Sequence, residues 1–255
     1  MKVTYKDHMG TDLSVVNAAR VSFGKESEYE FTEQARAVLS PSDQGLINFL
    51  ARGCTSGDWE DMMQRIGYGP DPLEPLLNHI RRMPPHWTPF AHTAISLHMK
   101  VPLFVARQIH KHQTGFVVNE VSRRYVTDEP EFYEPSKFRK AADNVKQGSS
   151  EEFLEDDVEI LSFGDTGYTD IGINEVALLW YKQAIKLGVC PEQARMVLPQ
   201  SMYTEFWMTG NLYGWANLYN QRSDPHAQKE TQEVAKQIGE IIEPLFPYSW
   251  KALTK

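Results

Sequence analysis

The residues best suited to chemistry lie together in the stretch 104–125, which reads FVARQIHKHQTGFVVNEVSRRY. This stretch holds cationic, imidazole, amide and hydroxyl side chains and one carboxylate, and apolar residues alternate with them. Lys and Arg hold anionic oxygens, whereas Asn, Gln and Ser form hydrogen bonds with amide edges. The composition therefore favours a pocket that binds a phosphorylated ligand, and this ligand would also carry groups that form hydrogen bonds.

A strand, a helix and a polar turn are expected to position these side chains. Residues 93–101 alternate in polarity, which predicts a strand. Pro102 suits the first turn of a helix, and 103–112 has helical spacing. Gly115 is expected to stop this helix, and 116–118 to run extended beyond it. The end of the helix and the turn would then present the polar groups to one common space.

The rest of the chain is predicted to supply further helices and strands. Helices are expected at 12–23, 58–66, 72–83, 175–187, 211–219 and about 227–243. Two more are expected to begin after the start signal at 40–43 and at residue 191. Strands are expected at 2–6 and 203–208. Three prolines in 84–90 exclude a continuous helix there. We expect one domain over 1–255, with surface excursions at about 56–83 and 128–172, the second with one short helix.

The composition describes an ordinary globular chain. Of its 255 residues, 24% are charged and 41% hydrophobic, and the formal net charge is −8. Nucleic-acid polymers attract basic surfaces, so this charge argues against a DNA- or RNA-binding protein. A single nucleotide needs only a local basic pocket, which the net charge permits.

The cysteines and the first residues bear on the compartment. Cys54 and Cys190 form no CxxC pair, so neither a zinc ribbon nor a disulfide framework is expected. The start MKVTYKDHMG lacks an apolar signal segment, and no run approaches the roughly 18 apolar residues of a membrane span. We therefore expect a cytoplasmic protein, or one of the host cytoplasm if the chain is viral, without a bound metal.

Three separated blocks of sequence carry a resemblance to a known family. They are HWTPFAH at 86–92 with FVARQ at 104–108, then KHQ at 111–113 followed by eight residues and Ser122, then ARMVLP at 194–199 with Asn211 and QRSDPHAQ at 221–228. In this order and spacing the chain resembles the flavin-dependent thymidylate synthases. The signature of that family is normally Arg-His-Arg, seven or eight residues, then Ser. Here Lys111 keeps one point charge and Gln113 none, which bears on how tightly a flavin is held.

The resemblance implies a reaction, a fold and an assembly. The family methylates dUMP to dTMP, taking the carbon from 5,10-methylenetetrahydrofolate, while FAD carries hydride delivered by NADPH. The implied fold is α/β, a central twisted sheet with helices around it. The implied assembly is a homotetramer whose active sites are shared between subunits.

The resemblance also implies which residues bind each ligand. The implied dUMP contacts are Gln108, Ile109, His110, Lys111, Glu120, Val121, Ser122, Arg123, Arg124, Arg195 and Arg222. The implied FAD contacts are Thr88, Lys111, His112, Gln113, Glu120, Asn211 and Asn217, and His86 is added because it lies on the same proline-rich path.

Residue chemistry suggests a role for several of these contacts. Arg124 and Arg195 are candidates for the dUMP phosphate. Arg222 is the candidate catalytic residue, since a fixed cation at the uracil edge stabilises charge that develops on the ring. Ser122 is expected to be a hydroxyl that positions the phosphate or the backbone, and not a nucleophile, because no neighbouring residue in the sequence is an obvious activating base. No cysteine lies in a matching block, so no thiolate attack on the ring is expected.

Two other functions stay open on the residues alone. A metal-dependent nucleotide hydrolase would use His86, His92, His110 and His112, although residues two apart on a helix point to different sides. A nucleotide-binding protein without catalysis would follow if the replacements in the signature had removed the flavin site. Two of the predicted site residues also have a purely structural alternative. Arg222 could be a solvated loop residue, and Asn211 could be a helix cap.

Overall fold

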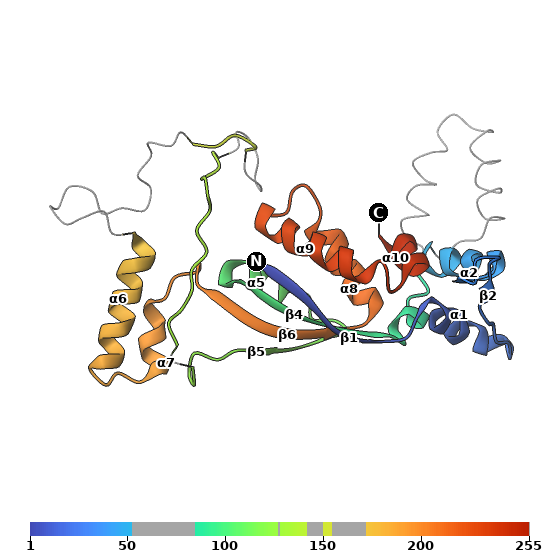
Figure 1. The fold of residues 1–255 in the computed structure, drawn as a ribbon, viewed down its shortest axis with the longest axis horizontal. Coiled ribbons are helices and arrows are strands. Elements are labelled where there is room, and N and C mark those ends of the chain that lie inside the picture. Colours follow the sequence, from blue (N-terminus) through green and yellow to red (C-terminus); the bar gives the residue numbers. More distant parts are fainter. Residues whose placement is uncertain (53–84, 127, 142–149, 155–171, 255) are drawn as a thin grey trace, which may run out of the picture. The chain divides into compact units, whose positions relative to one another are not determined.

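The structure is a computed structural model that describes residues 1–52, 85–126, 128–141, 150–154 and 172–254 (Figure 1). The expected helices at 58–66 and 72–83 lie outside these residues, as does much of the expected excursion at 128–172. Among the helices of the described ranges, none has the length and apolar character needed to span a bilayer.

The described chain divides into two compact units. Unit 1 comprises Met1–Lys6, Leu97–Met208 and Gln221–Ile238, and unit 2 comprises Asp7–Ser96, Thr209–Asn220 and Gly239–Lys255. Each unit therefore combines segments that are far apart in the sequence. The expectation of one domain over 1–255 stays a prediction.

Four strands form the main sheet in the order β1-β4-β6-β5 (Figure 1). They are β1 (Lys2–Met9), β4 (Ala94–Pro102), β5 (Phe116–Glu120) and β6 (Tyr203–Gly210), so all four predicted strands are confirmed. Alternate side chains of β4 are buried, as its polarity pattern requires. The sheet and the helices described below confirm the predicted α/β class.

Helix α5 (Leu103–Ile109) follows β4 directly in unit 1, because Pro102 is extended at φ −68° and ψ 153° and serves as its N-cap. The helix ends at Ile109 with His110 as its C-cap, so the prediction of a helix to residue 112 is wrong at that end. The chain turns earlier because the N–H of His112 donates to the carbonyl of Ile109. Gly115, at φ +80°, lies in this turn and does not itself end the helix.

Unit 1 also contains helical segments from the second half of the chain. They are α6 (Ile173–Lys186), α7 (Pro191–Ala194), which continues into the 3₁₀ turn η3 (Arg195–Val197), and α9 (Lys229–Ile242), whose last residues lie in unit 2. The predicted helices at 175–187, from 191 and at about 227–243 are thereby confirmed. The Gln237 side chain of α9 accepts a hydrogen bond from the N–H of Val3, at 2.9 Å, and so joins α9 to β1.

The described part of the excursion 128–172 is tied to unit 1. Phe132 forms an isolated bridge with Met202, and Arg139 forms one with Phe153. The Arg139 guanidinium also pairs with the buried carboxylate of Glu230 on α9, at 2.7 Å. The described residues of this excursion contain no helix, so the short helix predicted for it is not found among them.

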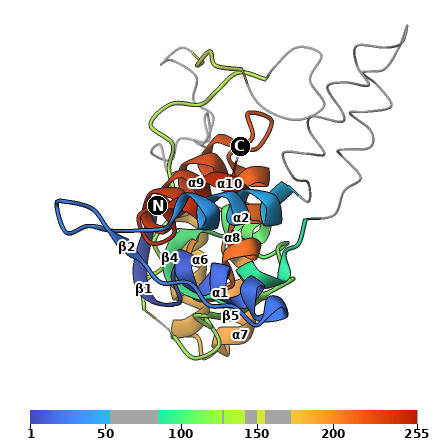
Figure 2. The ribbon, with the colours of Figure 1, turned by 90° about the vertical axis from the view of Figure 1, so that its right-hand side faces the viewer.

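Unit 2 is built from helices and a two-stranded antiparallel hairpin (Figure 2). Its elements are α1 (Asp12–Arg20), η1 (Val21–Phe23), β2 (Glu30–Phe31), β3 (Ala37–Val38), α2 (Pro41–Arg52), η2 (Thr88–Ala91), α8 (Leu212–Arg222, whose last two residues lie in unit 1) and α10 (Pro247–Leu253). The predicted helix at 12–23 is an α-helix only to Arg20. Helix α10, which packs against α2, was not predicted.

A buried carboxylate holds α1, α2 and the loop between them together. Asp43 of α2 accepts hydrogen bonds from the Nε of Arg20 at 2.9 Å, from Ser27 at 2.9 Å and from Ser40 at 2.8 Å. Burial alone would raise the pKa of the Asp43 carboxyl, but the hydrogen bonds from Arg20, Ser40 and Ser27 lower that pKa overall. Asp43 is therefore ionised and satisfied, and it positions the wall of the pocket described below.

Candidate active site

The last residue of α8, Arg222, is held against the turn that follows α5. Its Nε donates to Nε2 of His112 at 3.0 Å, and its Nη2 donates to the carbonyl of Gln108 at 3.1 Å. We call these three residues the guanidinium cluster. Two of the five N–H donors of a guanidinium are used in these bonds, so the remaining ones can serve a ligand.

The guanidinium cluster fixes the protonation state of His112. Its Nε2 accepts a hydrogen bond, so the proton of the neutral ring must lie on Nδ1. Burial, together with the charge of Arg222, lowers the pKa of His112 to about 4. Burial also lowers the pKa of Arg222, which nonetheless stays charged at neutral pH. The pair is thus a fixed cation with a neutral acceptor.

Gln108 extends the guanidinium cluster to the segment before α9. Its Nε2 donates to Oε1 of Gln228 at 2.6 Å. Gln228 closes the sequence block at 221–228, yet it was not among the predicted site residues. Its place at the end of that block was the signal that could have identified it.

The other residues of the turn differ in exposure. His110 packs its ring edge-on against Phe206, at 4.5 Å between centroids, and its buried Nε2 has no hydrogen-bond partner in the described part of the chain. Ile109 is fully buried in the core of unit 1. Lys111 and Gln113, the two altered signature residues, are exposed. They can therefore reach a ligand without disturbing the packing.

A second group of predicted site residues gathers around α7. The Nε of Arg124 pairs with Glu192 at 3.3 Å, and Arg195 follows Glu192 by one helical turn. We call Arg124, Glu192 and Arg195 the α7 cluster. Glu192 was not predicted as a site residue, and nothing in its sequence context distinguishes it from a solvated charge.

Ser122 shapes the backbone between β5 and the α7 cluster. Its Oγ accepts from the N–H of Arg124 at 3.3 Å, and its carbonyl accepts from the N–H of Tyr125 at 3.0 Å. The Arg123 guanidinium donates to the carbonyl of Asp128. The Ser122 hydroxyl thus acts as a turn-forming acceptor, in agreement with a positioning role.

Two further predicted contacts lie on the sheet. Thr204 donates to Oε1 of Glu120 at 2.5 Å, which fixes the carboxylate at the end of β5. Val121 and Arg123 line a cavity of about 530 Å³ together with Glu205 of β6. Seven of the eleven predicted dUMP residues thus fall into three groups: the guanidinium cluster (Gln108, Arg222), the α7 cluster (Arg124, Arg195) and this sheet surface (Glu120, Val121, Arg123). The other four, Ile109, His110, Lys111 and Ser122, belong to none of them. That these residues converge on one ligand stays a prediction.

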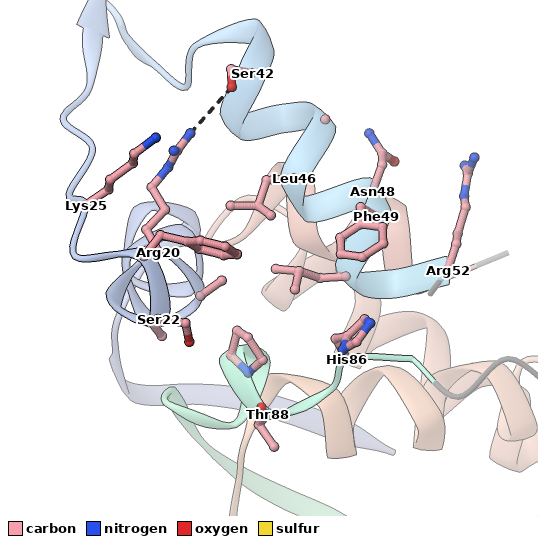
Figure 3. Close-up of a pocket in the computed structure, with 16 residues that line it drawn as sticks. Arg20, Ser22, Lys25, Ser42, Leu46, Asn48, Phe49, Arg52, His86 and Thr88 are labelled. Carbon is pink, nitrogen blue, oxygen red and sulfur yellow. Dashed lines mark hydrogen bonds between the residues drawn. The ribbon is translucent and has the colours of Figure 1, made fainter. Parts of the chain in front are cut away.

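The remaining predicted FAD contacts belong to unit 2. His86 and Thr88 line a cavity of about 1070 Å³ between α1, α2 and η2 (Figure 3). Asn211 caps α8, since its Oδ1 accepts from the N–H of Gly214 at 2.8 Å, whereas Asn217 is exposed on that helix. The structural alternative for Asn211 is therefore confirmed, while the alternative that Arg222 is a solvated loop residue is wrong.

No metal centre is found among the described residues, because no three His, Cys, Asp or Glu side chains lie close enough together to hold an ion. The four histidines of the hydrolase alternative are split between the units, with His86 and His92 in unit 2 and His110 and His112 in unit 1. Since Arg222 donates to Nε2 of His112, that nitrogen is already in use.

Comparisons with known proteins identify the family of the chain. The family model described as thymidylate synthase complementing protein matches residues 5–248. A flavin-dependent thymidylate synthase from Thermosipho africanus is 33% identical over 250 residues, which are 98% of this chain and 89% of that protein. One from Thermus thermophilus is 32% identical over 246 residues, 96% and 73% of the two chains.

A solved structure gives the same result for the fold. The UMP/dUMP methylase PolB from Streptomyces cacaoi, bound with 5-Br dUMP, superposes with a TM-score of 0.64 at 25% identity, over 98% of this chain and 93% of that one. The fold is therefore similar to that of a nucleotide methylase. The chain belongs to the flavin-dependent thymidylate synthase family.

Proposed function

We propose that this protein methylates dUMP to dTMP, with 5,10-methylenetetrahydrofolate as carbon donor and with FAD and NADPH for the reduction. Membership of the family supports the reaction class. The observation that carries the proposal is the guanidinium cluster, in which residues of two family blocks hold Arg222 as a fixed cation. A cation fixed before the substrate arrives needs little reorganisation to stabilise charge on the pyrimidine ring.

The residues present fit a flavin. Lys111 and Gln113 offer exposed ammonium and amide donors beside the neutral ring of His112, and Glu120 is fixed by Thr204. Thr88, His86, Asn211 and Asn217 would supply further contacts from unit 2. When bound, FAD supplies the hydride chemistry that protein side chains lack. The altered signature is expected to lower the affinity for FAD, because Gln113 cannot pair with a phosphate charge.

The α7 cluster is suited to the phosphate of dUMP. Arg124 and Arg195 are both exposed, and each can form charge-assisted hydrogen bonds to phosphate oxygens. Arg124 pairs with the carboxylate of Glu192 at 3.3 Å, so its guanidinium already binds an anionic group. Substrate would then replace one anion by another at the same guanidinium. The ring of dUMP would lie at Arg222, so that Arg222 stabilises negative charge as the ring reacts.

We propose that the protein is a homotetramer with active sites shared between subunits. Large apolar side chains on α6, in the loop after it and on η3 support this, because Trp180 is 66%, Leu187 72% and Met196 78% exposed. Exposed apolar side chains gathered in one region mark interaction surfaces. Partner subunits would also cover the exposed contacts of the turn and of the α7 cluster. We further propose a cytoplasmic location.

The experiment is a dTMP assay on the purified protein with dUMP, methylenetetrahydrofolate, NADPH and FAD, in which each component is omitted in turn. We expect a flavin absorption spectrum that bleaches under NADPH, and dTMP only in the complete mixture. UMP replaces dUMP in a parallel reaction, since the structural neighbour PolB is a methylase of both. Binding of dUMP without any response to FAD would instead indicate a nucleotide-binding protein without catalysis.

A further inference from the structure

The side-chain amide of Gln108, in the guanidinium cluster, has a fixed direction. Its Nε2 lies 2.6 Å from Oε1 of Gln228 and 3.5 Å from the backbone carbonyl oxygen of Phe104. A backbone carbonyl oxygen can only accept a hydrogen bond, so the amide nitrogen of Gln108 must face these two oxygens. The amide oxygen Oε1 of Gln108 is therefore turned away from them, and among the described residues it accepts no hydrogen bond.

Gln228 reaches Gln108 from a backbone that is itself held in place. The carbonyl of Gln228 accepts from the N–H groups of Thr231 at 2.9 Å and of Gln232 at 3.0 Å, at the start of α9. The Gln232 side chain in turn donates to the carbonyl of Ala227 at 2.7 Å, just before Gln228. The backbone of Gln228 is thus fixed on both sides along the chain, so its side chain always starts from the same position.

Glu230, two residues further on, supports the same direction of the two amides. Arg139 donates to both oxygens of this buried carboxylate, at 2.7 and 3.0 Å. Burial alone would raise the pKa of the Glu230 carboxyl, but hydrogen bonds, first from Arg139 and also from the side chain of Gln228, lower that pKa overall. An ionised carboxylate only accepts, so the amide nitrogen of Gln228 faces Glu230 and its oxygen faces Gln108.

Gln108 connects this chain of hydrogen bonds to the candidate catalytic cation. Its backbone carbonyl accepts from Nη2 of Arg222 at 3.1 Å, while its side chain is bound to Gln228. A nucleotide whose ring lies at Arg222 would thus be next to the residue that carries an unused acceptor. Arg222 offers donors and Oε1 of Gln108 offers an acceptor, so together they can recognise two different kinds of atom on one ligand.

The base and the sugar of dUMP carry only two hydrogen-bond donors. They are the N3–H of uracil and the 3′-hydroxyl of deoxyribose, whereas the carbonyl oxygens of the ring and the phosphate oxygens accept. A fixed acceptor in the protein can bind either donor, but an amide that rotates freely could present its own N–H instead. The direction of the Gln108 amide therefore decides whether it binds a donor of the nucleotide.

We propose that Gln228 is a positioning residue that holds the Gln108 amide so that Oε1 of Gln108 accepts a hydrogen bond from the N3–H or the 3′-hydroxyl of dUMP. This inference rests on the proposed function, and Gln228 itself need not touch the substrate. A site built to bind a donor rejects an analogue that lacks it, because the acceptor is left unpaired. The alternative is that the bond between Gln108 and Gln228 only joins α5 to α9, which would leave the choice of nucleotide unaffected.

The test compares dUMP with two analogues that each lack one donor. They are N3-methyl-dUMP and the 2′,3′-dideoxy nucleotide, and their dissociation constants are measured by calorimetry on the FAD-loaded protein. In the wild type we expect one analogue to bind about tenfold more weakly than dUMP, the value of one hydrogen bond. Gln228→Met has nearly the same shape but no acceptor, so we expect it to lose this tenfold preference. A steric effect of the added methyl group would be the same in both proteins.

A second substitution restores only the acceptor. Gln228→Glu offers Gln108 an oxygen and no N–H, at a helix start where a carboxylate is favourable, so we expect the tenfold preference to return. A purely structural contact would not follow this order, because a second carboxylate beside Glu230 disturbs the fold more than a Met does.

The control is Gln200→Met, the same exchange at an exposed residue of unit 1. It should keep the wild-type preference for dUMP over the analogue. Thermal unfolding of every variant shows whether the fold is kept, and we expect little change for Gln228→Met because that side chain is exposed.

The results that would overturn the inference differ in meaning. If Gln228→Met keeps the tenfold preference, or if Gln228→Glu does not restore it, Gln228 does not position the amide, and the proposed function is unaffected. If the wild type binds dUMP and both analogues equally, the Gln108 oxygen recognises neither donor, and the proposed function is again unaffected. If the wild type binds no dUMP at all, the proposed function is wrong, and the role of Gln228 fails with it.

Discussion

Arg222 and His112 are joined by a hydrogen bond of 3.0 Å in which the guanidinium is the donor and the imidazole the acceptor. Arginine usually pairs with an anion, and a carboxylate here would neutralise its charge. A neutral acceptor fixes the direction of the guanidinium and leaves its positive charge unneutralised. His112 therefore sets the orientation of the Arg222 guanidinium without neutralising its charge, so the orientation and the charge can be tested by separate substitutions.

Substitution of Arg222 tests the charge. We expect Arg222→Ala to abolish dTMP formation. The circular dichroism spectrum, which reports the fold, and the affinity for FAD measured without dUMP should stay as in the wild type. Arg222→Lys keeps the charge without the fork that contacts both His112 and Gln108, so it should retain only a small part of the rate. Turnover of the Ala variant near the wild-type value would show that Arg222 has no catalytic role.

Substitution of His112 tests the orientation. His112→Phe removes the acceptor, and we expect kcat to fall by about 10- to 100-fold, as for loss of one hydrogen bond to a charged group. His112→Gln provides a carbonyl oxygen that can accept from Arg222 and should recover part of the rate. FAD affinity is measured for both variants by fluorescence titration, so that a change in cofactor binding is counted separately. Equal kcat in the Phe and Gln variants would contradict the proposed role.

The lowered pKa of His112 predicts how stability depends on pH. The pKa is about 4 in the folded protein against an ordinary 6.5, so between these values the unfolded chain binds more protons at this residue. The contribution of His112 to the free energy of unfolding is thus fully present above about pH 6.5 and is lost progressively as the pH falls to about 4. Urea unfolding across this range should show a steeper pH slope for the wild type than for His112→Gln.

The altered signature predicts a gain of function. Gln113→Arg restores a cation at an exposed position, and we expect FAD to bind about tenfold more tightly, as for one added charge-assisted contact. Gln200→Arg places the same charge on another exposed residue of unit 1 and should leave FAD affinity unchanged. A weaker or unaltered affinity of the Gln113 variant, by fluorescence titration, would count against the placement of the signature.

Asp43 predicts a loss of stability in unit 2. Asp43→Ala leaves Arg20, Ser27 and Ser40 without their shared acceptor, and we expect a loss of about 3 kcal/mol, the size found when one partner of a buried ion pair is removed. Because the pKa of this carboxyl is lowered, its contribution is present above an ordinary Asp pKa and declines as the pH falls below it. Guanidinium unfolding measures both effects, and Asp7→Ala, at an exposed carboxylate of unit 2, is the control.

The strands were predictable from sequence because their signal is local. The alternation in 93–101 and the aromatic residues in 203–208 each indicate a strand without knowledge of the partner strand, and one face of each strand is buried. The end of α5 was not predictable in this way. Helical spacing continues to residue 112, but the helix ends at Ile109 and the turn begins at His110. The turn carries His112, which binds Arg222 of α8, and a contact with a residue so far away in the sequence cannot be read from the local pattern.

The site residues likewise divide into those that the sequence identified and those that it did not. The family blocks identified Gln108, His112 and Arg222, and the structure brings these three into contact. Glu192 could not be recognised, since its only distinction is an ion pair with Arg124, far away in the sequence. Asp43 was likewise visible only as part of a helix start, because its partners on α1 and in the loop depend on how those elements pack.

The exposure of Lys111 and Gln113 has a consequence for how such a protein can evolve. Both side chains project from a turn whose path is set by backbone hydrogen bonds and by Gly115, so exchanging them does not disturb the folded chain. If these two side chains hold the flavin as proposed, single mutations there can weaken or strengthen its binding while the rest of the molecule is inherited unchanged.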